Sequence, residues 1–356
     1  MLKGVLFGFG NMGESVVREM AERAGVQLIG VMDPTPDRRA VAEKNYGLKA
    51  AATADELLNL GKIDFALVTS PNAFHCGQVL QALQAGAHVY CEKPLALVLS
   101  ECDAMVAAAE ATQRINVVNF SIRYSGAGRT MKRLVDEGAV GDVLSAWRLR
   151  SRGYGLYTAG ARHPAVVRPD HSGGWTMHHM CHDIDAIYWL VGAYEKVWSL
   201  SRTTVPESAQ AGGHGGIGHS EELIWAMAEL NRTGQAVRPM AMLGDAVHRY
   251  HLEDHGVTGT KGTMHLERQA GQWVVVLQPE GGETGLRSDS GKALPKHVFE
   301  TESSAEPGGG LGHFFDCIVN GKSSQVTFRD ARAAVRVALA CQQSARSGGQ
   351  PVRVGD

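Results

Sequence analysis

A glycine turn close to the N-terminus constrains the fold of this chain more than any other feature. Gly8, Gly10 and Gly13 have G-x-G-x-x-G spacing and stand between a strand-like apolar run and a helical run. Gly8 permits a tight turn, Gly10 lets a pyrophosphate approach the main chain, and Gly13 lets the helix pack on the strand. Asn11 and Met12 begin the helix, whose free N–H groups can bind phosphates. A flexible turn is the alternative for an isolated triplet, but this context predicts a dinucleotide-binding site.

An aspartate after the second apolar run extends this prediction. Asp33 stands where a dinucleotide-binding fold places its ribose-binding acid. A carboxylate accepts both ribose hydroxyls and repels a 2′-phosphate, which favours NAD over NADP. Arg38 and Arg39 follow closely, and either could bind a 2′-phosphate instead. We therefore expect NAD as the cofactor, with NADP as the alternative.

Short apolar runs alternate with helical patterns over the first 120 residues. This alternation is typical of a parallel, doubly wound sheet, because parallel neighbours need crossover helices. The 356 residues suit two domains. We expect an α/β Rossmann domain over residues 1–122 and a second domain over residues 123–356.

The second part of the chain has a different pattern. It begins with a helix near residues 126–137, and several antiparallel strand-like runs lie between residues 197 and 277. Residues 281–310 are rich in glycine and charge, which predicts a long surface excursion. A strongly amphipathic helix follows at 330–346, and we expect it to pack back toward the Rossmann domain. These elements predict an α+β C-terminal domain with a large open, mostly antiparallel sheet.

A Glu–Lys–Pro sequence ends one of the buried strands. Glu92 and Lys93 come directly after the apolar run that ends at Cys91. In an open α/β sheet the carboxyl ends of the strands border the ligand crevice, so the pair should face the cofactor. A partly desolvated lysine there can exchange a proton with an alcohol. An exposed loop lysine is the alternative.

Residues 173–185, with the sequence GGWTMHHMCHDID, hold three histidines and two aspartates. His178, His182 and Asp185 are spaced i, i+4 and i+7, which places them on one stripe of an α-helix. His179 lies off this stripe and off the neighbouring apolar stripe, so we interpret it as a packing or solvated residue. The alternative for all three histidines is hydrogen bonding within the core.

A metal site is a second interpretation of these histidines. His178 and His182 at i, i+4 could chelate zinc, with a third ligand from His163, Asp170 or His171. The H-x-x-x-H pattern is loose without its other signature residues. We expect no metal.

Taken together, the motifs resemble the Gfo/Idh/MocA family of oxidoreductases. The resemblance covers the chain in order: the glycine turn, TSPNAFH at 69–75, AGAHVYCEKP at 85–94, the glycine–histidine helix, and ARAAVRVALACQQSARSGGQPV at 331–352. It implies a Rossmann domain followed by a domain with a large open sheet, which often pairs subunits into dimers or tetramers.

The resemblance also implies roles for single residues. Lys93 would be the catalytic general acid/base, and Glu92 would lie by the nicotinamide ribose. Arg123 and Asp185 would lie close to the substrate, and His182 and Asp185 match the family's histidine and trailing aspartate. His178 stands where the family has its usual aspartate, which is a departure. The residues that would line the cofactor are Thr69, Pro71, Asn72, His75 and Asn119.

These observations predict an NAD(P)-dependent dehydrogenase that transfers hydride between a secondary alcohol of a sugar, inositol or related polyol and the nicotinamide. His182 would be the partner or relay of Lys93, and His178 would position a neighbouring hydroxyl. The loop before the histidine helix offers further hydrogen-bonding groups suited to a polyhydroxylated substrate, among them Tyr154, Tyr157 and His163.

Two other functions compete with this one. An NAD-dependent glycosidase or lyase could oxidise a sugar transiently through a keto-sugar, and the altered residue at His178 keeps this alternative open. A non-catalytic NAD-dependent sensor is the second, but a sensor has no need of Lys93 and His182.

Composition excludes several classes of partner. The net charge is −2 and no block of Lys and Arg collects, so we expect no nucleic-acid partner. No apolar run reaches the length of a membrane span. The six cysteines show no CxxC pairing, and the N-terminus begins with a strand, so we expect a reduced cytoplasmic protein. The broad open sheet predicts a homodimer or homotetramer.

Overall fold

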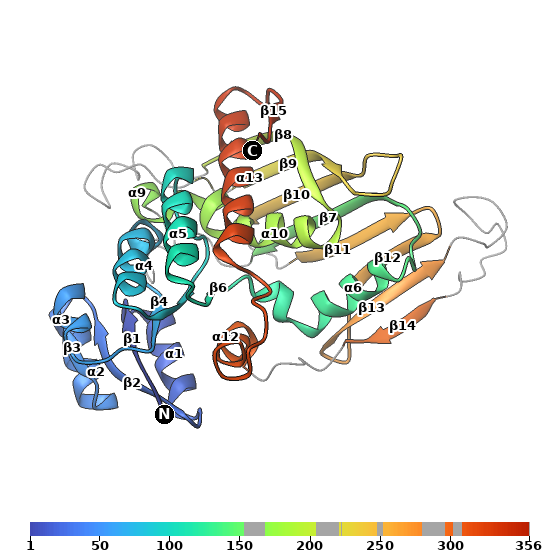
Figure 1. The fold of residues 1–356 in the computed structure, drawn as a ribbon. Helices are drawn as coiled ribbons and strands as arrows, with labels where there is room; N and C mark the ends of the chain where they lie inside the picture. Colours follow the sequence, from blue (N-terminus) through green and yellow to red (C-terminus); the bar gives the residue numbers. More distant parts are fainter. Residues whose placement is uncertain are drawn as a thin grey trace. The chain divides into compact units, whose positions relative to one another are not determined.

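Figure 1 shows the chain as a computed structural model, which describes residues 1–152, 168–203, 221, 223–247, 252–279, 296–301 and 308–355. The described residues form two compact units. The first unit comprises those among residues 1–120, 165–178 and 306–335, and the second comprises those among 121–164, 179–305 and 336–356. The predicted division after residue 122 stays a prediction.

A parallel sheet forms the centre of the first unit, as the sequence predicts. Its six described strands have the order β3-β2-β1-β4-β5-β6, and each neighbouring pair is parallel. The order reverses between β1 and β4, which is where an open α/β sheet binds its ligand. The strands are β1 (Leu2–Phe7), β2 (Val26–Met32), β3 (Lys49–Ala51), β4 (Phe65–Val68), β5 (His88–Cys91) and β6 (Asn116–Val118).

Helices join these strands at the predicted places. The sequence TADE at 53–56 forms a capping box, in which Thr53 accepts the Glu56 N–H while the Glu56 carboxylate accepts the Thr53 N–H. The connecting helices are α1 (Asn11–Ala21), α2 (Pro36–Tyr46), α3 (Ala54–Leu58), the short 3₁₀ turn η1 (Asn72–Phe74), α4 (His75–Gln84) and α5 (Leu99–Thr112). None of the described helices is long and apolar enough to cross a membrane.

Two helices from the end of the chain also belong wholly or partly to the first unit. α12 (Gly309–Asn320) begins with two glycines that we assigned to a surface excursion, so that assignment is wrong at residues 309–310. The reason is apolar packing, since Phe314 and Phe315 place their rings 6.5 Å and 5.0 Å from that of Phe65. The expected terminal helix is confirmed as α13 (Phe328–Arg346), and the Phe328 N–H donates to Asn116 Oδ1 of β6 at 2.7 Å.

A nine-stranded mixed sheet dominates the second unit, with the order β14-β13-β12-β11-β7-β10-β9-β8-β15. Its described neighbours are antiparallel except for the parallel pair β7 and β10, which confirms a mostly antiparallel sheet. The strands are β7 (Val143–Arg152), β8 (Ala193–Arg202), β9 (Leu223–Asn231), β10 (Met240–Val247), β11 (Leu252–Gly259), β12 (Gly262–Gln269), β13 (Gln272–Pro279), β14 (His297–Glu300) and β15 (Val352–Arg353).

The two faces of this sheet differ in burial. Along β9, Ile224, Ala226 and Ala228 are buried, while Trp225 and Met227 between them are about half exposed. This alternation follows from the two-residue period of a strand. The buried face packs against α6 (Gly126–Asp136) and α10 (Cys181–Leu190). Polar side chains at inward positions of this face are therefore buried as well.

Candidate active site

The glycine turn lies at the carboxyl end of β1. Gly8 has a φ of 88°, and a Cβ on it would come within 2.5 Å of the Ser70 main chain. A Cβ on Gly13 would lie 2.1 Å from the Gly8 carbonyl oxygen, so glycine is needed for α1 to pack this close to β1. The described atom nearest to a Cβ on Gly10 is Arg38 Nη1, at 3.5 Å. Gly10 therefore leaves room for a ligand to approach the main chain.

Asp33 follows β2 and is only 2% exposed. Its Oδ2 accepts the Phe9 N–H at 3.0 Å, and its Oδ1 accepts the Thr35 N–H at 2.9 Å. The Arg38 guanidinium lies 3.5 Å from Asp33 Oδ2, while Arg39 donates to the Asp33 main-chain carbonyl at 2.8 Å. An acid and two cations therefore meet beside the glycine turn, where a ribose or a 2′-phosphate would be recognised.

Buried side chains hold the loop that follows β4. Thr69 Oγ1 donates to the Gly8 carbonyl at 2.7 Å, which joins this loop to the glycine turn. His75 is 0% exposed, and its ring nitrogens lie 2.9 Å from the Ser70 carbonyl and 2.8 Å from the Pro94 carbonyl. Burial lowers the pKa of His75, although these carbonyls oppose the effect. A contribution of His75 to the cofactor site is then indirect, through the loops that it holds.

Glu92 and Asn119 lie together at the ends of β5 and β6. Asn119 Nδ2 donates to Glu92 Oε1 at 2.8 Å, and the Asn119 N–H donates to the Cys91 carbonyl at 3.0 Å. Burial raises the pKa of Glu92, and the Asn119 hydrogen bond and the Lys93 charge oppose this effect. The pair is therefore positioned at the carboxyl edge of the sheet, beside Lys93 in the chain.

The structure brings Lys93 and His178 together, although they are 85 positions apart in the chain. Lys93 Nζ donates to the His178 main-chain carbonyl at 2.7 Å. Asn72 is buried, and its Nδ2 lies 2.8 Å from the Ser172 carbonyl and 3.1 Å from His178 Nδ1. The lysine thus contacts the main chain of His178, while the imidazole contacts Asn72.

The helix of the histidines differs from the α-helix that we expected. Thr176–Met180 form a π-helical turn, which is wider than an α-helical turn, so the predicted i, i+4 stripe does not continue through it. His179 is not solvated, since its side chain is 12% exposed and is hydrogen-bonded within the core, which is the alternative that we gave for the histidines. His179 Nδ1 lies 2.6 Å from Oδ2 of the fully buried Asp245, and the rings of His179 and His182 are 5.9 Å apart.

Arg123 and Asp185, both predicted to lie near the substrate, form a buried pair in the second unit. Arg123 Nε lies 2.8 Å from Asp185 Oδ2, and Nη2 lies 2.6 Å from Oδ1. The guanidinium also lies 5.8 Å from the centre of the Trp189 ring. A two-point ion pair of this kind fixes the geometry of both side chains. Each residue therefore helps to hold the other in place.

A second buried charge cluster, which we did not predict from the sequence, lies on the inner face of the nine-stranded sheet. Arg148 Nε and Arg150 Nη2 lie 2.6 Å and 3.1 Å from Asp183 Oδ1. Burial alone would raise the pKa of Asp183, but the two arginines lower it to about 2. Burial and the neighbouring Arg148 also lower the pKa of His255 to about 2, so this imidazole is neutral.

These missed residues share one position in the sequence pattern. Arg148, Asp245 and His255 occupy buried, inward-facing positions of β7, β10 and β11. Such positions usually carry apolar residues, because the polar residues of a half-buried strand face outward. A charged residue at an inward strand position could have indicated the cluster. Its partners, however, are distant in the chain and no local pattern identifies them.

Some predicted residues and ligands remain untested. Tyr154, Tyr157 and His163 lie outside the described residues. Across the residues that the structure does describe, no three His, Cys, Asp or Glu side chains gather as a metal site.

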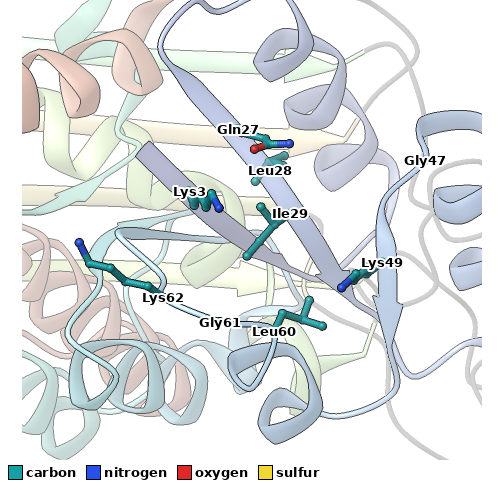
Figure 2. A pocket seen from close by; sticks show the side chains of 9 residues that line it. All are labelled: Lys3, Gln27, Leu28, Ile29, Gly47, Lys49, Leu60, Gly61 and Lys62. Atoms are coloured by element: carbon teal, nitrogen blue, oxygen red, sulfur yellow. The ribbon is translucent and has the colours of Figure 1, made fainter. Parts of the chain in front are cut away.

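A pocket of about 400 Å³ lies at the opposite, amino-terminal edge of the parallel sheet (Figure 2). Three lysines and several apolar residues from the beginnings of β1, β2 and β3 and the loop before β4 line it: Lys3, Gln27, Leu28, Ile29, Gly47, Lys49, Leu60, Gly61 and Lys62. It is separate from the carboxyl edge, where the glycine turn, Asp33 and Lys93 lie.

The groups at the carboxyl edge of the first unit fit a dinucleotide. Asn11 and Met12 begin α1 and are exposed, so the helix N-terminus is open to an anion. The open approach at Gly10 and the acid at Asp33 match the pyrophosphate and the ribose of such a ligand. Pro71 precedes η1 at the same edge.

Comparison with known proteins agrees with this assignment. Residues 2–120 match an oxidoreductase family with an NAD-binding Rossmann fold, GFO_IDH_MocA, and residues 129–265 match the GFO/IDH/MocA C-terminal domain. The chain is 25% identical to a scyllo-inositol 2-dehydrogenase (NAD⁺) of Bacillus subtilis over an alignment of 360 positions, which covers 98% of this chain and 95% of the relative. It is 31% identical to inositol 2-dehydrogenase 3 of Saccharopolyspora erythraea, over 52% of each chain.

One further relative is named for a different reaction: it is a 2,7-anhydro-N-acetylneuraminate hydratase of Mediterraneibacter gnavus. It is 25% identical over 74% of this chain and 66% of its own length.

Solved structures share the fold. An oxidoreductase of Agrobacterium radiobacter in complex with NAD⁺, L-tartaric acid and magnesium has a TM-score of 0.80 at 16% identity, over 99% of this chain and 98% of that chain.

The myo-inositol 2-dehydrogenase of Lactobacillus plantarum has a TM-score of 0.77 at 22% identity, over 99% of both chains. The two family matches cover the Rossmann sheet and much of the nine-stranded sheet, in the order in which the chain presents them. This chain therefore belongs to the Gfo/Idh/MocA family of NAD-binding oxidoreductases.

Proposed function

We propose that the protein is a dehydrogenase that oxidises a secondary alcohol of a sugar, an inositol or a related polyol, or catalyses the reverse reduction. The observation that carries the proposal is the position of Lys93. Its amine is held at 2.7 Å by a main-chain carbonyl, at the carboxyl edge of an NAD-binding fold. The names of the inositol dehydrogenases among the relatives support this substrate class.

The hydrogen bond to His178 suits Lys93 for proton transfer. A carbonyl oxygen only accepts, so it uses one N–H of the lysine and fixes the direction of the amine. In its neutral form the amine has a lone pair, which can take the proton of the substrate hydroxyl during oxidation. Bound NAD supplies the hydride acceptor. His182 is proposed as the partner or relay of Lys93, and His178 as a group that positions a neighbouring hydroxyl.

NAD is the proposed cofactor, with NADP as the alternative. Asp33 supports NAD because its carboxylate carries the charge that repels a 2′-phosphate. The Arg38 guanidinium, 3.5 Å from that carboxylate, is the group that would favour NADP.

The test is a panel of inositols, aldoses and sugar acids, assayed with NAD and with NADP by absorbance of the reduced cofactor. We expect one member of the panel to reduce the cofactor stoichiometrically, with NAD preferred. A protein that binds NAD tightly but reduces it with no member of the panel would contradict the proposal.

A reaction without net oxidation is the second candidate, and the hydratase among the relatives favours it. In that reaction the cofactor would be restored in each cycle, after elimination or addition next to a transient keto group. Turnover of a glycoside or anhydro sugar without accumulation of reduced cofactor would favour this candidate over the dehydrogenase.

A further inference from the structure

The neighbouring histidines 178 and 179 are bound by chemically opposite partners. His178 Nδ1 lies 3.1 Å from an amide nitrogen of Asn72, whereas His179 Nδ1 lies 2.6 Å from a carboxylate oxygen of Asp245. An amide nitrogen only donates, and an ionised carboxylate only accepts. The two contacts therefore demand opposite protonation at the same ring atom.

The direction of the Asn72 amide is fixed by a second contact. Its Nδ2 also lies 2.8 Å from the main-chain carbonyl of Ser172, which only accepts. Exchanging the amide oxygen and nitrogen would place two acceptors against each other, so Nδ2 is the atom that faces both partners. It gives one hydrogen to the carbonyl and one to His178, and His178 Nδ1 must then be unprotonated.

Burial favours a neutral Asp245, whereas the nearby charge of Arg150 and a hydrogen bond from an imidazole favour the ionised form. Asp245 is 0% exposed, and Arg150 of β7 occupies the register position beside it. Glu253 of β11 lies opposite Arg150, while Asp183 of α10 is already bound by Arg150. His179 is thus the side chain that gives Asp245 a short hydrogen bond.

Two further imidazoles complete these surroundings. His182 of α10 has its ring 5.9 Å from that of His179, and His255 of β11 is neutral. The neutral His255 adds no positive charge that could compete with His179 for the carboxylate.

We infer that Asn72 and Asp245 are positioning residues that fix His178 as the Nε2-protonated tautomer and His179 as the Nδ1-protonated tautomer. Nε2 of His178 is then a hydrogen-bond donor, and Nε2 of neutral His179 is an acceptor. A ligand group that meets His178 must offer an acceptor, and one that meets His179 must offer a donor. A hydroxyl can do either, which fits a polyol; this last consequence rests on the proposed function, whereas the tautomers do not.

The tautomers are tested by nitrogen NMR of protein labelled with ¹⁵N-histidine, without substrate and near neutral pH. His178→Gln and His179→Gln identify the two spin systems by the signals that they remove. We expect a protonated Nε2 for His178 and a protonated Nδ1 for His179. The opposite tautomer at either residue, or a mixture that exchanges freely, would overturn the inference for that residue.

Substitution of the partners gives the second measurement. Asn72→Asp should move the proton of His178 to Nδ1 or protonate both nitrogens, because a carboxylate accepts where the amide donated. Asp245→Asn should release His179 from a single tautomer. His265→Gln, which removes a partly exposed histidine 3.7 Å from Glu267, is the control and should leave the signals of both residues unchanged. If a partner variant does not fold, the wild-type spectrum still decides.

Activity separates this inference from the proposed function. A protein that oxidises no polyol but shows both tautomers overturns the function and leaves the tautomers intact. If a polyol is oxidised, Asn72→Asp should move the acid limb of the pH–rate profile to higher pH by roughly one unit, since a nearby carboxylate stabilises the imidazolium. An unchanged profile in a folded Asn72→Asp enzyme would overturn the positioning role of Asn72.

Discussion

At the carboxyl edge of the six-stranded sheet, main-chain groups make most of the polar contacts, whereas on the inner face of the nine-stranded sheet charged side chains contact each other. In the first unit, Asp33 accepts two main-chain N–H groups and Lys93 donates to a main-chain carbonyl. In the second, Arg148 contacts Asp183 and Arg123 contacts Asp185. The first arrangement can bind a ligand through the backbone, and the second holds a fixed set of buried charges.

This difference has an energetic consequence. Main-chain donors at a turn keep their positions when a side chain is changed, so binding there should be robust to substitution. A buried ion pair is different, because removing one partner leaves an uncompensated charge in the protein interior. We therefore expect side-chain substitutions to affect chemistry in the first unit and stability in the second.

The largest effect should come from Lys93→Met. We expect turnover to fall by roughly 10² to 10⁴, the range for loss of a general acid–base group, while NAD affinity changes little. Steady-state kinetics and NAD titration measure the two quantities. Lys62→Met, which removes an exposed lysine paired with Asp64, is the control and should leave both unchanged. Turnover within a few-fold of wild type would remove Lys93 from the mechanism.

Asp183→Asn tests the buried charges of the second unit. The substitution leaves Arg148 and Arg150 without their carboxylate, which should lower the free energy of unfolding by about 3–5 kcal/mol. Denaturant titration measures this change. Asp316→Asn removes a partly exposed partner of Lys322 and should cost about 1 kcal/mol or less. Equal losses in the two variants would show that the buried cluster contributes no more than a surface pair.

The same cluster predicts a dependence of stability on pH. The pKa of Asp183 is lowered from 3.8 to about 2 in the folded protein, so its contribution to stability is complete above about pH 5 and is lost as the pH falls toward 2. The pKa of His255 is lowered from 6.5 to about 2, so the folded state should also lose stability as the pH falls below 6.5. In a plot of unfolding free energy against pH, Asp183→Asn should remove the loss of stability that Asp183 causes at low pH. The loss that His255 causes below pH 6.5 should remain.

The two regions also differ in how well the sequence predicts them, because one depends on residues close in the chain and the other on contacts between distant residues. The glycine turn and the end of β5 depend on residues that are close in the chain, and the sequence predicted them. The contact of His179 with Asp245 spans 66 positions, and the pairing of Arg123 with Asp185 spans 62. No local pattern encodes such pairs. The π-helical turn escaped prediction because residues 176–180 have ordinary helical composition.

The outer face of the nine-stranded sheet extends the comparison, because it exposes large apolar side chains, whereas the inner face holds the buried charges. Trp225, Met227 and Met242 are 52%, 49% and 45% exposed on neighbouring strands, and we propose that this face joins subunits of a homodimer or homotetramer. Trp225→Glu with Met227→Glu should weaken assembly by 2 kcal/mol or more, roughly a 30-fold change in dissociation constant, since aromatic anchors dominate interfaces. Sedimentation should show a smaller species.

The control for this assembly experiment is Val319→Glu. Val319 is an exposed apolar residue of α12, outside the sheet, and its replacement should leave the sedimentation mass unchanged. A wild-type mass of one chain at micromolar concentration would contradict the assembly itself.

The smallest expected effect concerns Asp33. We expect this side chain of the first unit to set the preference between NAD and NADP, while the main chain of the glycine turn provides most of the cofactor binding. Asp33→Ser should raise the ratio of NADP to NAD efficiency by roughly tenfold, the effect of about 1.4 kcal/mol, because it removes the charge that repels a 2′-phosphate. Asp37→Ser, which removes an exposed acid in the first turn of α2, is the matched control and should leave the ratio unchanged. Steady-state kinetics with both cofactors measure it. A wild-type enzyme that uses NADP better than NAD would make Arg38, 3.5 Å from the Asp33 carboxylate, the phosphate ligand and would reverse the role assigned to Asp33.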